Sequence, residues 1–86
     1  GLNLDAEGKY WVAKNVTLKA DEEIKFRFKH DWTDNLGGEF AVDSAISLTA
    51  GGANMKTTEG TFDIYLDVAA SKAYIMTAGK TPADAN

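Results

Sequence analysis

Apolar and polar side chains alternate along much of the chain. The clearest examples are EIKFRFK at 23–29 and TFDIYLDV at 61–68, in which every second residue is apolar. A period of two residues is typical of a strand with one buried face. No segment carries the sustained 3.6-residue apolar stripe of an amphipathic helix. The pattern predicts an all-β chain.

Short polar segments rich in glycine, aspartate and asparagine separate these runs, for example at 20–22, 31–39, 50–52 and 69–72. Six to eight short strands joined by such turns predict a small antiparallel β-sandwich, with a small open barrel as the alternative. We expect one β-sandwich module over residues 1–78. The segment 79–86 is small and polar and holds the only proline, so we expect a flexible tail.

The two best strands carry opposite charges on their polar faces. Cations occupy positions 25, 27 and 29, whereas Asp63 and Asp67 flank Tyr65 on the other strand. If the two strands are neighbours, these charges can pair across the sheet. The cationic face is otherwise a solvated surface or one half of a binding surface, and His30 at its end reads as a surface or half-buried histidine.

Composition narrows the functional classes. The chain has 86 residues, no cysteine and a net charge of −4. The charge argues against nucleic acid or an anionic membrane as the main partner, because both need a basic surplus. The longest apolar run is only a few residues, so we expect no membrane insertion of this module, and no signal peptide is visible.

Catalysis lacks its usual residues. The chain has one histidine and no serine in a nucleophile elbow, and its glycines match neither a phosphate loop nor a dinucleotide fingerprint. Asp63 and Asp67 are about 13 Å apart along one strand, which is too far for a glycosidase pair. We therefore predict a protein that is not an enzyme and that carries no cofactor.

Oxygen-bearing side chains gather between residues 31 and 43, and such ligands suit calcium. They are Asp31, Asp34, Asn35, Glu39 and Asp43. Their spacing does not follow the EF-hand register, and loops of this composition are commonly plain turns. We predict an ordinary loop over 31–39 and no metal site.

The two tryptophans, Trp11 and Trp32, raise the question of sugar binding. Trp11 is out of phase with Tyr10 and Val12, so it is predicted to point away from the core that they help to form. An exposed indole beside lysine, arginine and asparagine suits a pyranose, which offers a C–H face for stacking and hydroxyls for hydrogen bonds. The alternative is that both indoles only cover the ends of a small sandwich.

Three ordered segments cover nearly all of 9–77, namely GKYWVAKNVTLKADEEIKFRFKHDWTDNLGG, AGGANMKTTEGTFDIYLDV and KAYIMTA. In this order they resemble the repeated module of SusE/SusF-type outer-membrane lipoproteins of Bacteroidetes. The resemblance implies an immunoglobulin-like β-sandwich that binds starch or maltooligosaccharides without catalysis. It also implies a cell-surface location through a lipid anchor elsewhere in the full-length protein, with neighbouring modules and a TonB-dependent uptake complex as partners. An immunoglobulin-like spacer without a ligand is the alternative.

The resemblance also implies the sugar contacts. A lysine of the "KF" strand and an asparagine of the "GG.N" turn bind glucose hydroxyls in the family, and they match Lys25 and Asn54. Arg27 shares the face of Lys25 and is expected to assist. Family modules usually begin with a further tryptophan-containing segment that supplies the stacking platform, and the resemblance starts after it. The module is therefore truncated, divergent, or one whose platform is rebuilt from Trp11, Trp32 or Tyr65.

Overall fold

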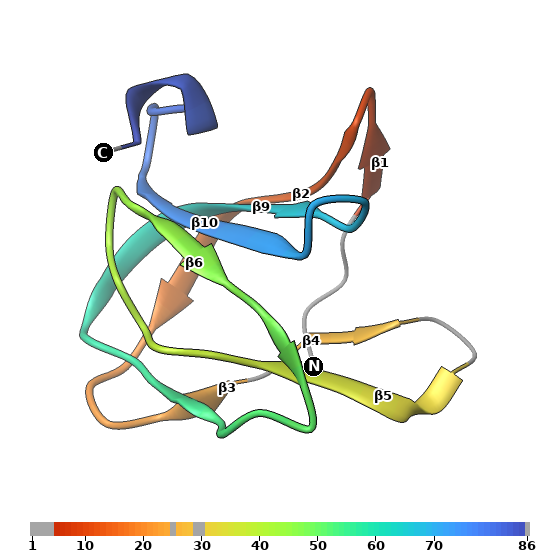
Figure 1. Ribbon diagram of the computed structural model, residues 1–86. Coiled ribbons are helices and arrows are strands. Elements are labelled where there is room, and N and C mark those ends of the chain that lie inside the picture. Colours follow the sequence, from red (N-terminus) through yellow and green to blue (C-terminus); the bar gives the residue numbers. More distant parts are fainter. Residues whose placement is uncertain (1–4, 25, 29–30, 86) are drawn as a thin grey trace.

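The computed structural model describes residues 5–24, 26–28 and 31–85. These residues form ten strands and a short 3-10 helix (Figure 1), namely β1 (Asp5–Glu7), β2 (Tyr10–Leu18), β3 (Glu23–Ile24), β4 (Phe26–Phe28), β5 (Asp31–Gly37), β6 (Ala45–Ser47), β7 (Thr49–Ala50), β8 (Met55–Lys56), β9 (Gly60–Asp67), β10 (Lys72–Thr77) and η1 (Pro82–Asp84). Within the described residues, all strand ladders are antiparallel. An isolated bridge between Val42 and Ile75 is parallel.

The strands make two layers. One layer is a five-stranded sheet with the order β1-β2-β9-β10-β6, and the other contains the pair β3-β8 and the three-stranded sheet β4-β5-β7. Figure 1 shows β9, β10 and β6 above β3, β4 and β5. The predicted small antiparallel all-β sandwich is therefore confirmed.

The main core lies between the two layers. Its buried residues are Leu18, Ile46, Leu48, Met55, Phe62, Ile64, Leu66, Ala73 and Ile75. Phe62, Ile64 and Leu66 supply every second position of β9, as the alternation predicts. Each large side chain buried in this way contributes about 1.5–3 kcal/mol to stability, so the inner face of β9 is a principal stabilising element.

A β-bulge interrupts β2 in its middle. The strand pairs with β9 in one register up to Ala13 and in a shifted register from Val16 onward, so that Lys14 and Asn15 lie opposite the single residue Asp63. Asn15 has a φ of 56°, in the left-handed region that asparagine tolerates better than most residues. An extra residue in one strand reverses which of its following side chains face inward.

The bulge explains a wrong prediction about Trp11. Because the phase reverses, Trp11 faces inward together with Val16 and Leu18 and packs, half-buried, against the main core. Tyr10 and Val12 face outward instead and belong to a separate cluster. The prediction that Trp11 points away from the core was wrong because it placed Tyr10 and Val12 on the core face of the strand.

The outward face of β9 is buried as well. Asp63, Tyr65 and Asp67 are only 4%, 6% and 7% exposed, although the alternation placed them on a polar surface. Tyr65 forms a small second cluster with Val12 and Met76, which Tyr10, Tyr74 and Ala85 cover in part. Both faces of β9 are therefore covered by other parts of the chain.

Buried carboxylates need hydrogen-bond donors, and backbone amides supply them here. Asp63 accepts hydrogen bonds from the amides of Asn15, at 2.9 Å, and Gly79, at 3.0 Å. Asp67 accepts one from the amide of Ala70 at 3.1 Å. The charge of Asp63 thus joins the bulge of β2 to the segment that follows β10.

Charge pairing between the cationic strand and β9 was conditional on the two strands being neighbours. They are not: β4 pairs with β5, whereas β9 pairs with β2 and β10 in the other layer. The condition for charge pairing is therefore not met, because strand charge alone does not determine strand order. Lys25, Lys29 and His30 lie outside the described residues.

The predicted loop over 31–39 is also corrected. Residues 31–37 form β5, whose backbone pairs with β4 through Phe26 opposite Leu36 and Arg27 opposite Asn35. Aspartate and asparagine disfavour strands, but pairing with two neighbouring strands overrides a weak local preference. Trp32 therefore lies on a strand and not in a loop.

The segment after β10 lies against the outward face of the five-stranded sheet. Thr81 and Asp84 form a capping box around η1, with the Thr81 amide 2.9 Å from the Asp84 carboxylate. The Tyr65 hydroxyl donates to the Lys80 carbonyl at 3.5 Å, and Ala85 packs on the small cluster. The described residues of the expected tail thus have a defined conformation, and their flexibility in solution stays a prediction.

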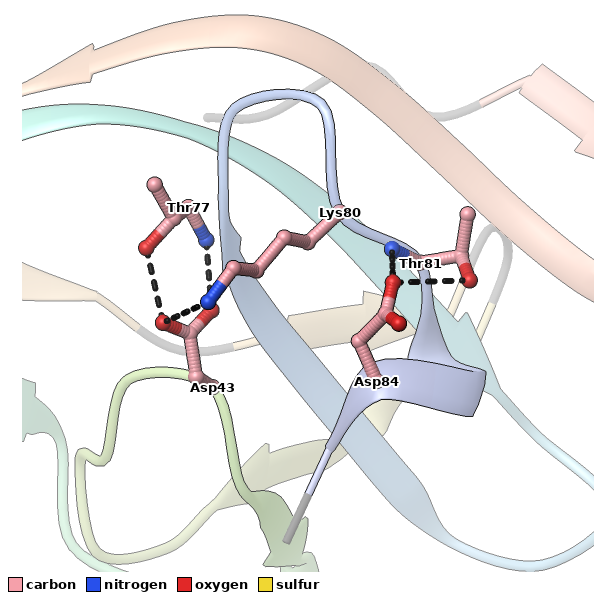
Figure 2. Close-up of polar contacts among 5 residues, drawn as sticks. All are labelled: Asp43, Thr77, Lys80, Thr81 and Asp84. Carbon is pink, nitrogen blue, oxygen red and sulfur yellow. Dashed lines mark hydrogen bonds and ion pairs between the residues drawn. The ribbon is translucent and has the colours of Figure 1, made fainter.

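Asp43 binds Thr77, the last residue of β10, and lies close to Lys80 (Figure 2). Its carboxylate accepts hydrogen bonds from the amide and the hydroxyl of Thr77, each at 2.7 Å, and lies 3.6 Å from the Lys80 ammonium. Its own amide donates to the Ile75 carbonyl at 2.9 Å. Asp43 and Asp63 therefore fix the segment 77–80 with two carboxylates.

These two carboxylates predict acid sensitivity. The Thr77 amide, its hydroxyl and Lys80 lower the pKa of Asp43, and the amides of Gly79 and Asn15 lower that of Asp63 although burial opposes the shift. A carboxylate whose pKa is lower in the folded state stabilises the fold above its unfolded value of 3.8 and loses that contribution as the pH falls through the folded value. The free energy of unfolding in urea should therefore decline below about pH 4.

The control for acid sensitivity is a substitution that removes one carboxylate. Asp43→Asn should be less stable than the wild type at neutral pH and should lose less stability on acidification. Glu59→Gln, at an exposed turn, should leave the pH dependence unchanged. An Asp43→Asn profile parallel to that of the wild type from pH 7 to pH 2 would contradict the assignment.

Candidate functional site

Two segments that are distant in sequence lie side by side in the second layer. Strands β3 and β8 pair with Glu23 opposite Lys56 and Ile24 opposite Met55. Met55 is 1% exposed and anchors β8 in the main core. The residue before it, Asn54, is exposed, and its amide nitrogen lies 3.5 Å from a Glu23 carboxylate oxygen.

Glycines position the turn that carries Asn54. Gly51 has a φ of 71°, and the Gly52 amide donates to the Thr49 carbonyl at 3.0 Å. The Gly38 amide donates to the Ala53 carbonyl at 3.1 Å. A side chain at Gly37 would overlap the carbonyl oxygens of Gly52 and Ala53, so only glycine allows this close approach.

Three motif segments therefore converge in this layer. The end of β5 carries NLGG, the turn after β7 carries GGAN, and β3 is the start of the EIKF segment. Strand β5 pairs with β7 through Gly37 opposite Thr49, and β8 pairs with β3. Hydrogen bonds between segments that are far apart in sequence thus hold the surroundings of Asn54 in place.

The predicted sugar-binding residues fall into three groups. Asn54 is exposed on the turn described above. Arg27 and Trp32 have described backbones, in β4 and β5, while their side chains and the whole of Lys25 lie outside the described residues. Trp11 belongs to the five-stranded sheet, where one side of its indole packs on the main core.

Glu23 is a polar residue of this region that the motif comparison did not include. Its carboxylate accepts the amide hydrogen of Asn54, and the Asn54 carbonyl oxygen has no hydrogen-bond donor among the described residues. Both side chains are exposed, so they present acceptors and donors to solvent. The sequence could have indicated Glu23, because it alternates in step with Lys25 and Arg27 and is therefore predicted to share their face of the strand.

The described part of the chain offers no group of three or more histidine, cysteine, aspartate or glutamate residues placed to hold a metal ion. Asp43, one of the residues considered for calcium, is bound to Thr77 and Lys80. Among the described residues, no helix is both long and apolar enough to cross a membrane.

Comparison with known proteins gave no match to a family model, a curated protein or a solved structure.

Proposed function

We propose that the chain is a non-catalytic glycan-binding module whose ligand is starch or a maltooligosaccharide. The pairing of β3 with β8 carries this proposal. The resemblance to SusE/SusF-type modules requires Lys25 and Asn54, which are far apart in sequence, to bind one sugar. The pairing of Ile24 with Met55 supports this requirement, since these residues directly precede Lys25 and directly follow Asn54.

The chemistry of the exposed groups is suited to a sugar. The Asn54 amide has both donors and an acceptor, and Glu23 adds an acceptor, so the pair can bind hydroxyls that do both. Lys25 and Arg27 are the proposed further donors, and Trp32 is the proposed stacking platform. Each hydrogen bond nets only about 0.5–1.5 kcal/mol against water, so stacking has to supply much of the affinity.

The resemblance supports a setting for this activity. The module belongs, in this proposal, to a lipoprotein of the outer membrane, displayed at the cell surface by a lipid anchor elsewhere in the full-length protein. It holds polysaccharide near neighbouring modules and a TonB-dependent uptake complex. The alternative of a ligand-free spacer predicts buried tryptophans and charge pairing between the cationic strand and β9. Trp11 is half-buried on the main core, as the spacer predicts, whereas the two strands are not neighbours.

Titration of the ¹⁵N-labelled chain with maltoheptaose tests the proposal. The amides of residues 23–24 and 51–56 should shift, and Asn54→Ala should weaken binding about fivefold, the equivalent of one hydrogen bond of about 1 kcal/mol. Glu59→Ala, at an exposed position outside both strands, should bind as the wild type does. Unchanged spectra at millimolar sugar would reject starch binding and favour the spacer.

A further inference from the structure

Three tyrosines gather on the outward face of the five-stranded sheet, away from the main core. The ring of Tyr10 meets those of Tyr65 and Tyr74 edge to face, with centroids 5.8 Å and 6.0 Å apart and interplanar angles of 79° and 87°. Tyr65 is buried, whereas Tyr10 and Tyr74 are half-buried and keep part of their rings in solvent. We call these three residues the tyrosine surface.

The tyrosine surface is rigid because its base is held on several sides. Tyr65 stands on β9 opposite Val12 of β2 and Tyr74 of β10. Its hydroxyl donates to the Lys80 carbonyl at 3.5 Å. Edge-to-face rings of this kind contribute about 0.5–1.5 kcal/mol beyond their burial, so Tyr10 and Tyr74 are fixed before any ligand arrives.

Polar groups of both signs border the tyrosine surface. Asp67, Lys72 and Ser47 are register partners on β9, β10 and β6, in the row next to that of Tyr65 and Tyr74. The Lys72 ammonium donates to the Ser47 hydroxyl at 3.0 Å. Asp67 is itself buried and accepts from the Ala70 amide, so the polar groups that this row presents beside the aromatic rings are the Lys72 ammonium and the Ser47 hydroxyl.

Lys9 adds a cation at the same edge. Its ammonium lies 5.1 Å from the centre of the Tyr10 ring and 3.8 Å from the Asp67 carboxylate. The interaction with Tyr10, followed by the field of Asp67, raises the pKa of Lys9. The ammonium of a second lysine, Lys14, lies 5.9 Å from the centre of the Tyr65 ring.

We propose that the tyrosine surface is a second oligosaccharide-binding surface. Aromatic rings that are exposed in part accept the C–H face of a pyranose, and the neighbouring ammonium and hydroxyl groups match hydroxyls that both donate and accept. The mixture of charges suits an uncharged sugar chain better than a polyanion, for which cations alone would be expected. An apolar protein partner would leave these charges buried, at a cost in affinity.

This surface is separate from the Asn54 region. The tyrosines face outward from the five-stranded sheet, whereas Asn54 and Glu23 belong to the layer that covers the other face of that sheet. Two sites on opposite sides of one small module would allow it to bind two chains or two stretches of one polymer. Such bivalent binding raises the avidity for a polymer without any new contact.

Tyrosine ring signals test this proposal without any substitution. The aromatic ¹H–¹³C spectrum of the chain is recorded during separate titrations with maltoheptaose, cellohexaose and xylohexaose. We expect at least one sugar to shift the ring signals of Tyr10 and Tyr74. Asn54→Ala should leave those shifts unchanged, whereas Tyr74→Ala should weaken the binding that they report about tenfold, the loss typical of an anchoring aromatic residue. Tyr74→Phe keeps the ring and should bind within about twofold of the wild type.

The results separate this proposal from the proposed function. Shifts at Tyr10 and Tyr74 without shifts near Asn54 support the tyrosine surface and reject the starch site. Shifts near Asn54 alone, or tyrosine shifts that disappear in Asn54→Ala, overturn the tyrosine surface. Ring signals that stay fixed with every sugar up to roughly 10 mM, the range of very weak binding, also overturn it. Dilution-dependent ring signals, with a dimer in sedimentation, would identify a second copy of the chain as the occupant and overturn it too.

Discussion

Replacing Asp63 with asparagine should lower the free energy of unfolding by about 2–4 kcal/mol, because the side chain holds two backbone amides in a buried position. Asp63 is 4% exposed and accepts from Asn15 and Gly79. Asparagine has nearly the same shape but only one acceptor oxygen, so its amide nitrogen would face one of the two N–H groups. Urea denaturation followed by tryptophan fluorescence measures the loss.

Exchange of individual amides adds a local test of the Asp63 substitution. At least one of the Asn15 and Gly79 amides should exchange faster in Asp63→Asn than global unfolding alone explains, because it loses its acceptor. Glu59→Gln serves as the control and should change stability by less than about 0.5 kcal/mol, as expected for a surface position. A loss below about 1 kcal/mol with unchanged exchange would mean that the bulge and the segment after β10 do not depend on this charge.

The fold class followed from the sequence because the alternation in 61–68 and the polar turns are local properties. The orientation of β2 did not follow, because Tyr10, Val12, Val16 and Leu18 share a parity and asparagine at position 15 is only a weak signal of the left-handed conformation at the bulge. A bulge is a feature of pairing, and here the carboxylate of Asp63 on the neighbouring strand stabilises it. A single period of two across the whole of β2 therefore put Tyr10 and Val12 on the wrong face.

The same reasoning explains the polar face of β9. Asp63 and Asp67 looked exposed because their charges suit water, and their backbone partners could not be foreseen from the strand itself. Asn15, Gly79 and Ala70 come from turns and a bulge whose shapes depend on the folded chain. Carboxylates that accept hydrogen bonds from backbone amides allow a strand to be buried on both faces while its sequence still alternates between apolar and polar residues.

The two candidate surfaces differ in how far the sequence could identify them. Asn54 was identified from an ordered set of motifs, and the pairing of β3 with β8 supports its grouping with the EIKF segment. The sequence did not predict the tyrosine surface as a unit: Tyr65 was named as a candidate stacking residue, but Tyr10 was assigned to the core and Tyr74, in the KAYIMTA segment, was given no role. Register across β2, β9 and β10 brings the three rings together, and register is fixed by the whole sheet.

Replacing Trp11 with alanine should lower the free energy of unfolding by about 2–4 kcal/mol, somewhat less than for a fully buried tryptophan. Trp11 packs on the main core from the strand that pairs with β9 through Leu66. Its removal leaves a gap beside the buried residues and exposes them to water. The affinity of the folded variant for maltoheptaose at the Asn54 region should stay within about twofold of the wild type, well below the loss of an anchoring aromatic residue.

Tyr10→Ala is the matched control, since the neighbouring residue points to the other face of the same strand. It should cost less stability than Trp11→Ala, because Tyr10 packs only on the small outer cluster. It should instead weaken any binding that the Tyr74 ring signal reports. If Trp11→Ala changes stability by less than about 1 kcal/mol and abolishes sugar binding, the indole is a binding platform and not a core residue. The adjacent pair of substitutions thus tests whether Trp11 faces the main core while Tyr10 faces the tyrosine surface.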